Sequence, residues 1–192
     1  MIISTMKHRI FIAILLPEEL KIKIAKFQEN LWPSILQSNL QGGLRWVKTE
    51  NLHFTLAFIG WVDEEQIVRI KEVVRDISQR FPLFPLKLTK VTLGPNEKYP
   101  RMLWVVGEKE KELEKIWQEI RNKLKEIQIP IDEHHPPKIH LTLARARGRE
   151  LFGKKIDQKI DLNFLVKEIA IMESHLNPGG AEYKTLSKFP LR

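Results

Sequence analysis

Apolar residues in the first part of this chain change from strand spacing to helix spacing. Arg9–Leu16 is an almost unbroken apolar run, which is typical of a buried strand, and Pro17 suits the first position of a following helix. The helix is predicted to end at Pro33 or in the loop after it. Its apolar residues, three or four positions apart, are Leu20, Ile24, Phe27 and Leu31.

Two further helices follow from the same spacing. Asp63 and Gln66 stand three residues apart, as in a capping box, and so predict a helix start. The apolar face of that helix comprises Ile67, Ile70, Val73, Val74 and Ile77. A third helix is predicted over Glu108–Ile127, with one apolar stripe and charges elsewhere. That stripe comprises Leu113, Ile116, Trp117, Ile120, Leu124 and Ile127.

The remaining apolar segments are short and predict strands. After the first strand they cover residues 45–47, 53–59, 83–93, 102–106, 139–144, 166–172 and 183–189. Gly60 is expected to stop the second of these, residues 145–159 to form a basic loop, and "NPGG" at 177–180 to form a turn. Helices and strands therefore interleave without a linker. This order predicts an α+β fold in which residues 1–192 form a single domain of two similar lobes facing a central cleft.

One quartet occurs once in each predicted lobe. His53-Phe54-Thr55-Leu56 returns as His140-Leu141-Thr142-Leu143, 87 residues later. Because side chains alternate faces along a strand, each histidine and its threonine share one face, opposite an apolar face. A lone His-x-Thr is more often structural, but the repetition in matching strands favours a shared function. Two histidines and two threonines are expected to converge in the cleft.

These residue types suit displacement at phosphorus. A neutral imidazole can take a proton from the attacking hydroxyl or water, and an imidazolium can protonate the leaving oxygen on the other side. Threonine hydroxyls can donate to the non-bridging oxygens, where negative charge builds up. This chemistry requires no metal.

Composition narrows the function further. The chain has 192 residues and no cysteine, which excludes disulfides, thiolate nucleophiles and cysteine-based zinc sites and fits a cytoplasmic location. No apolar run reaches the roughly 18–20 residues of a membrane span. A net charge of +8 favours polyanionic partners such as nucleic acid, although a Lys/Glu-rich surface of the thermophile type explains it equally well.

The two quartets and their surroundings resemble the RNA 2′,3′-cyclic phosphodiesterases, also called 2′-5′ RNA ligases, of the 2H phosphoesterase superfamily. The similar text spans the chain: "RIFIAILLPEE", "LRWVKTENLHFTLAFIGWVDEEQ", "PRMLWV" and "SHLNPGGAEYKTLSKFPL". The resemblance implies two pseudo-symmetric lobes, each with an antiparallel sheet and flanking helices. It implies hydrolysis of RNA 2′,3′-cyclic phosphate ends to 2′-phosphomonoesters without metal or cofactor, and in many members 2′-5′ ligation.

The resemblance also implies residue roles. His53 would be the proton donor, His140 the proton acceptor, and Thr55, Thr142 and Arg145 would bind the phosphate. Arg145 stands five residues after His140, so a regular strand would point it to the opposite face. The strand is therefore expected to end or bulge near Ala144, or the arginine to reach round from the edge.

Other residues allow two interpretations. Arg101 is a further candidate for the site, with a solvated strand end as the alternative. Tyr183, Phe11 and Trp46 could each stack on a base of the substrate or pack in the core. The basic residues Arg147, Arg149, Lys154 and Lys155 would contact RNA or form a solvated loop. His134 and His135 beside His140 match no usual metal-ligand spacing, so no metal site is predicted.

Two alternative functions keep the fold. The chain could act on a small cyclic phosphate or a 2′-5′ linked nucleotide, which needs little basic surface around the cleft. It could instead be a non-catalytic RNA-binding module, although binding alone does not require a matched acid and base. A monomer is expected.

Overall fold

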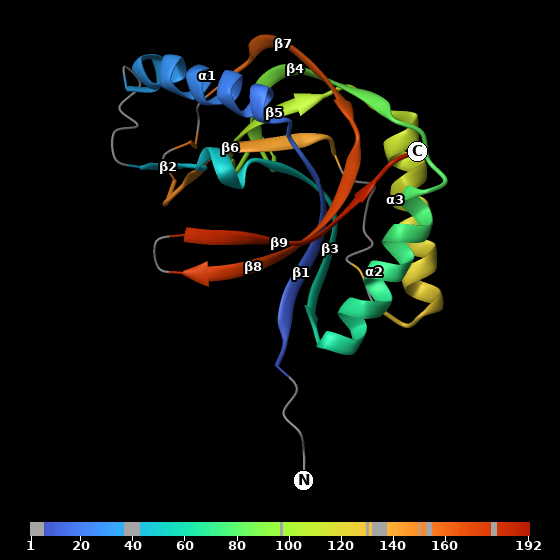
Figure 1. The fold of residues 1–192 in the computed structure, drawn as a ribbon. Coiled ribbons are helices and arrows are strands. Elements are labelled where there is room, and N and C mark those ends of the chain that lie inside the picture. Colours follow the sequence, from blue (N-terminus) through green and yellow to red (C-terminus); the bar gives the residue numbers. More distant parts are fainter. Residues whose placement is uncertain are drawn as a thin grey trace.

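The computed structural model describes residues 6–36, 43–96, 98–129, 131, 138–149, 151–152, 155–177 and 180–192. Their strands form two antiparallel sheets, in the order β3-β1-β8-β9 (sheet A) and β2-β6-β5-β4-β7 (sheet B). Figure 1 shows the two sheets set at an angle, with the long β1 and β3 descending from their junction. The α+β prediction with two antiparallel lobes is confirmed.

The elements follow one another in a mixed order. They are β1 (His8–Leu15), α1 (Glu18–Leu36), β2 (Leu44–Trp46), a 3₁₀ turn (Thr49–Asn51), β3 (His53–Val62), α2 (Glu64–Ser78), β4 (Phe84–Gly94), β5 (Met102–Gly107), α3 (Lys111–Glu126), β6 (His140–Ala146), β7 (Gln158–Val166), β8 (Glu168–Asn177) and β9 (Gly180–Pro190). The predicted capping box at α2 is present, with Asp63 accepting from the Gln66 amide at 2.9 Å.

Two boundary predictions were wrong. Part of the predicted basic loop is strand β7, which lies at the edge of sheet B beside β4. Gly60 does not stop β3, because it takes a positive φ of 89° that glycine tolerates, and the strand continues to Val62. Helix α1 continues past Pro33 to Leu36, so of its two predicted ends the later one agrees with the structure, since a proline removes only one backbone donor from the helix.

The strand order interleaves the two halves of the sequence. Strand β2, from the first half, pairs with β6 in sheet B, and β8 from the second half pairs with β1 in sheet A. One apolar core includes buried residues from both sheets, such as Ile12 of β1 and Leu141 of β6. Each quartet nevertheless lies in its own sheet, as predicted.

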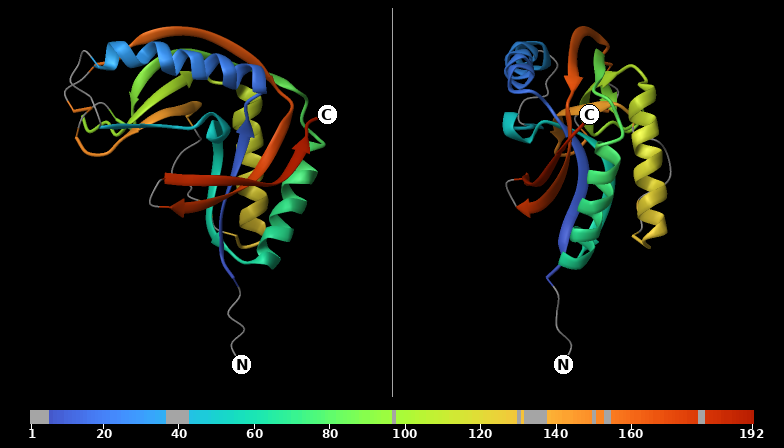
Figure 2. Two further views of the ribbon diagram at one scale, coloured as in Figure 1. Left: turned by 60° about the vertical axis from the view of Figure 1, so that its left-hand side comes forward. Right: turned by 45° about the vertical axis from the view of Figure 1, so that its right-hand side comes forward.

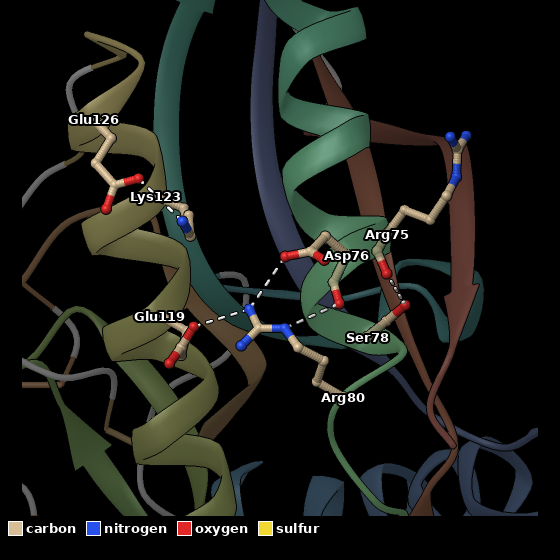
Figure 3. A network of polar contacts seen from close by, with 7 residues as sticks. All are labelled: Arg75, Asp76, Ser78, Arg80, Glu119, Lys123 and Glu126. Atoms are coloured by element: carbon tan, nitrogen blue, oxygen red, sulfur yellow. Dashed lines mark hydrogen bonds and ion pairs between the residues drawn. The ribbon is translucent and has the colours of Figure 1, made fainter.

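Helices α2 and α3 lie side by side on one side of the molecule, away from β2 (Figures 1 and 2). Arg80, just after α2, joins them, because its Nη2 donates to Asp76 at 3.2 Å and to Glu119 of α3 at 2.9 Å (Figure 3). This network lies on the solvent side and adds little to stability.

Candidate active site

The first quartet lies in β3, whose pairing with β1 contains a bulge. Ala57 pairs with Ile12 and Thr55 with Ala13, so Leu56 is an extra residue on β3. Leu56 and Ala57 are consequently both buried, and Phe58 turns to the same face as His53 and Thr55. That face is the one on which Phe11 lies, because Phe11 pairs with Phe58.

The second quartet repeats this bulge in β6. Ala144 pairs with Leu103 and Thr142 with Trp104, so Leu143 is the extra residue, and Leu143 and Ala144 are both buried. The phase of the strand changes, and Arg145 comes to the face that carries His140 and Thr142. The predicted difficulty with Arg145 is thus resolved by a bulge next to Ala144.

The bulge in β6 is held from two sides. The carbonyl oxygen of Leu143 accepts hydrogen bonds from the backbone N–H of Val47 at 2.8 Å and from the Gln28 side chain of α1 at 3.1 Å. The same Gln28 amide donates to the Val47 carbonyl at 3.1 Å. Helix α1 therefore helps to fix the direction in which Arg145 points.

The two quartets meet at the junction of the sheets. Strands β3 and β6 are in contact. The charge of Arg145 lowers the pKa of both histidines, and His140 lowers that of His53 as well. Both imidazoles therefore lie near one guanidinium.

Each imidazole is anchored in the same way. Nδ1 of His53 lies 2.7 Å from the carbonyl oxygen of Asn51, and Nδ1 of His140 lies 2.8 Å from that of Lys138. Because a carbonyl oxygen only accepts, each Nδ1 carries the hydrogen and donates it. Nε2 is left in both rings as the nitrogen that takes or gives a proton.

Both histidines are neutral in the free site at pH 7. Burial lowers the pKa of His53 from 6.5 to about 4, although the hydrogen bond to Asn51 raises it. Burial also lowers the pKa of His140, with Arg145 adding to the effect. An anionic phosphate between the rings would raise both pKa values, because it offers the opposite charge. One ring can then gain the proton that an acid needs.

Aromatic rings fix the two imidazoles differently. The His53 ring lies 4.9 Å from that of Phe11 and 4.8 Å from that of Tyr183, between centroids. The His140 ring lies 4.1 Å from the ring system of Trp104, with 33° between the planes. Gly94 makes room for that indole, since a Cβ at this position would overlap it.

The two threonine hydroxyls are available to a ligand. Thr55 and Thr142 are half-buried, and neither side chain bonds to another residue among those the structure describes. Each stands two residues after its histidine on the same face. Two hydroxyls and the Arg145 guanidinium thus accompany the two Nε2 atoms, which is a suitable set for a phosphoryl group.

The weaker candidates divide between the site and its surroundings. Tyr183 belongs to the site through its contact with His53, and Phe11 packs there too. The side chain of Arg101 is exposed just before β5. Trp46 packs against the core. Of the residues predicted in the basic loop, Arg147 and Lys155 are exposed, Arg149 lies over Phe152, and Lys154 falls outside the described residues. The two histidines considered as metal ligands, His134 and His135, also fall outside them.

Three residues near the site were not predicted. The contacts of Trp104 and Gln28 depend on strand register and helix placement, which the sequence does not show. Phe58 had a readable signal, because "HFTLAF" and "HLTLAR" place Phe58 and Arg145 at equivalent positions of the repeated motif. The repeat therefore brings an aromatic ring from sheet A and a cation from sheet B to the same junction.

No group of three or more His, Cys, Asp or Glu side chains among the described residues is arranged to hold a metal ion. No helix in the described part of the chain is long and apolar enough to cross a membrane.

Comparison with known proteins agrees with this geometry. Two antiparallel sheets that each present a His-x-Thr strand to the other define a 2H phosphoesterase. A model of the "LigT like Phosphoesterase" family matches residues 14–104, and an RNA 2′,3′-cyclic phosphodiesterase of Methanocaldococcus jannaschii is 32% identical over 190 residues, covering 94% of this chain and 99% of that protein. The chain belongs to this LigT-like phosphoesterase family.

Solved structures support the same fold. The crystal structure of TT0787 of Thermus thermophilus superposes with a TM-score of 0.81 at 28% identity, covering 96% of this chain and 98% of that one. LigT of E. coli, complexed with 3′-AMP, gives a TM-score of 0.77 at 25% identity, covering 97% and 99%.

Proposed function

We propose that this chain hydrolyses RNA 2′,3′-cyclic phosphate ends to 2′-phosphomonoesters. The observation that carries the proposal is the pair of imidazoles, each anchored through Nδ1, each two residues before a threonine of the same strand, and both affected by the charge of Arg145. The activity for which the M. jannaschii relative is named and the 3′-AMP complex of E. coli LigT support it.

In the proposed reaction, His140 takes a proton from water as its oxygen forms a bond to phosphorus. The bond from phosphorus to the 3′ oxygen breaks, and His53 gives that oxygen a proton. Arg145 and the two threonines hold the non-bridging oxygens, where charge accumulates. The net change is addition of one water across one P–O bond, and no redox partner is needed.

The assignment of acid and base comes from the family resemblance. In the free site burial lowers the pKa of both histidines, that of His53 to about 4, so the free site does not favour either assignment. Phosphate binding changes both values, so the assignment is decided with substrate present. With an RNA 5′ hydroxyl in place of the attacking water, the same base, the same acid and the same 3′ leaving oxygen would give a 2′-5′ bond.

The test is turnover of a short RNA ending in a 2′,3′-cyclic phosphate, with excess EDTA. Wild type should release a 2′-phosphate, and His53→Ala and His140→Ala should each lower kcat by about 10²–10⁴-fold. His175→Ala, which removes an exposed histidine of β8, serves as the matched control. Turnover that requires a metal, yields a 3′-phosphate or survives either substitution would contradict the proposal.

The same variants assign the two roles. A 3′-deoxynucleoside 2′-(p-nitrophenyl phosphate) has a leaving group that needs no proton. The variant lacking the acid should therefore keep most of its activity on this diester, whereas the variant lacking the base should lose it. A larger loss in H53A than in H140A would reverse the assignment.

A cytoplasmic location and a monomeric state belong to the proposal as predictions.

A further inference from the structure

The end of sheet B beside the histidines concentrates positive charge. The segments 43–47, 98–107 and 138–149 contribute β2, β5 and β6 there, and none of them contains Asp or Glu. Elsewhere in the described chain, cations often have carboxylate partners, such as Arg80 with Asp76 and Glu119. Within these three described segments the arginines therefore have no carboxylate neighbour.

Two of these arginines share one face, and a third follows directly after β6. Arg45 of β2 pairs directly with Arg145 of β6, and the backbone N–H of Arg147, two residues further on, donates to the Gly43 carbonyl at 2.8 Å. Side chains directly opposite in an antiparallel pair lie on the same face, so Arg45 shares the face of Arg145 and His140. The β6 bulge is what brings this face into phase with His140.

Neighbouring guanidinium groups repel each other unless an anion lies between them. Within the part of the chain that the structure describes, none of the three arginines forms an ion pair with a carboxylate. The hydrogen bond recorded for the Arg145 side chain goes to the sulfur of Met102 at 3.1 Å, and thioether sulfur is a weak acceptor. Most of its donors are therefore free to bind a ligand.

Arg45 also reaches the other sheet. A Cβ added to Gly180, at the start of β9, would lie 3.2 Å from Nη1 of Arg45. Close by, the Asn51 side chain donates to the Ala181 carbonyl at 3.4 Å. The guanidinium of Arg45 thus lies where sheet B approaches sheet A, on the side of the histidines.

We propose that Arg45 and Arg147, next to Arg145, bind a second phosphate of the substrate, namely the phosphodiester on the 5′ side of the terminal nucleotide. The proposal rests on the proposed function. A cyclic phosphate carries one negative charge, which Arg145 can neutralise, and the next phosphate of an RNA strand is one nucleotide away. The site accordingly takes the end of a polynucleotide in preference to a small cyclic nucleotide.

The experiment compares two substrates with the same terminal base, a nucleoside 2′,3′-cyclic phosphate and a dinucleotide ending in that group. Wild type should prefer the dinucleotide. Arg45→Gln should lower kcat/KM for the dinucleotide by about ten- to a hundredfold more than for the mononucleoside. Lys125→Gln, which removes an exposed charge from α3 on the far side of the molecule from β2 (Figure 1), should alter neither value.

Salt supplies a second readout. The plot of log kcat/KM against log salt should be steeper for the dinucleotide, by about 0.7 for one additional single-strand phosphate contact. Arg45→Gln should remove that difference. Arg147→Gln should reduce both the dinucleotide preference and the salt slope.

Two outcomes would overturn the proposal. In the first, wild type would show no preference for the dinucleotide. In the second, Arg45→Gln would lower kcat/KM equally for both substrates, which would mean that Arg45 contacts the reacting phosphate or only joins the two sheets. Titration with a 2′-phosphorylated dinucleotide and with a 2′-mononucleotide makes the same comparison without turnover. A chain that turns over neither substrate would refute the proposed function, and the titration would still decide whether Arg45 binds a second phosphate.

Discussion

At the scale of single residues, burial has the largest effect on the pKa of His53. Two histidines and two threonines at matching positions predict an acid–base pair around an anion. The lowered pKa of His53 depends on burial between Phe11, Tyr183 and β6, and residues up to 130 positions away supply that burial. Such contacts have no signature in the local sequence.

The pKa of His53 predicts how stability depends on pH. The group titrates near 4 in the folded chain and near 6.5 when unfolded, so the unfolded chain binds its proton first as the pH falls. This contribution to stability is present above about pH 6.5 and is lost toward pH 4, by about 3 kcal/mol. Urea unfolding between pH 4 and 7.5 should show that the free energy of unfolding falls less steeply with decreasing pH in His53→Asn than in wild type. Parallel curves would show that His53 does not titrate in this range.

At the scale of elements, apolar periodicity located all three helices and all but one of the strands. The missed strand, β7, lies at a sheet edge and alternates polar and apolar residues from Lys159 to Phe164, which is a readable signal of a half-buried strand next to the expected basic loop. The bulge at Leu56 escaped prediction for another reason, and the bulge near Ala144 was expected only as one alternative, because of where Arg145 stands. A bulge is a relation between two strands, and a single segment does not specify the register of its partner.

Gln28 is predicted to act on the site through the β6 bulge. Gln28→Ala leaves part of the Leu143 and Val47 carbonyl bonding unmade, which should lower the free energy of unfolding by about 1–2 kcal/mol. Because the bulge directs Arg145, kcat/KM should fall by about tenfold, a loss large enough to separate from experimental error.

Gln118→Ala, which removes an exposed glutamine of α3, is the matched control and should change neither quantity appreciably. Urea denaturation and turnover of the same preparations give both numbers. A Gln28→Ala variant that is less stable but fully active would show that Val47 alone holds the bulge.

At the scale of the whole molecule, the two sheets share one apolar core, and each sheet contains strands from both halves of the sequence. The two lobes are therefore distinct in shape, but they share a core and are not independent folding units. This arrangement also explains why a site with nearly symmetric motifs can have unlike walls, with Phe58 on one sheet and Arg145 on the other.

The shared core predicts a single cooperative unfolding transition for residues 1–192. Tryptophan fluorescence and far-UV circular dichroism should give coincident urea curves. Leu141→Ala, which truncates a fully buried side chain of sheet B, should move both curves together by about 3 kcal/mol. Two separated transitions would show that the lobes unfold independently.

The pairing of β1 with β8 also has a consequence while the chain is being synthesised. Five consecutive residues of β1, Ile10–Ile14, are buried in the finished protein, yet one of the strands that flank β1 begins only at Glu168. At ordinary rates of translation the ribosome needs roughly 8–30 s to make the intervening residues. During that time the nascent chain exposes an unpaired apolar edge, so β1 is where a chaperone would be expected to bind first. A chain released before β8 should aggregate and should not persist as half an enzyme.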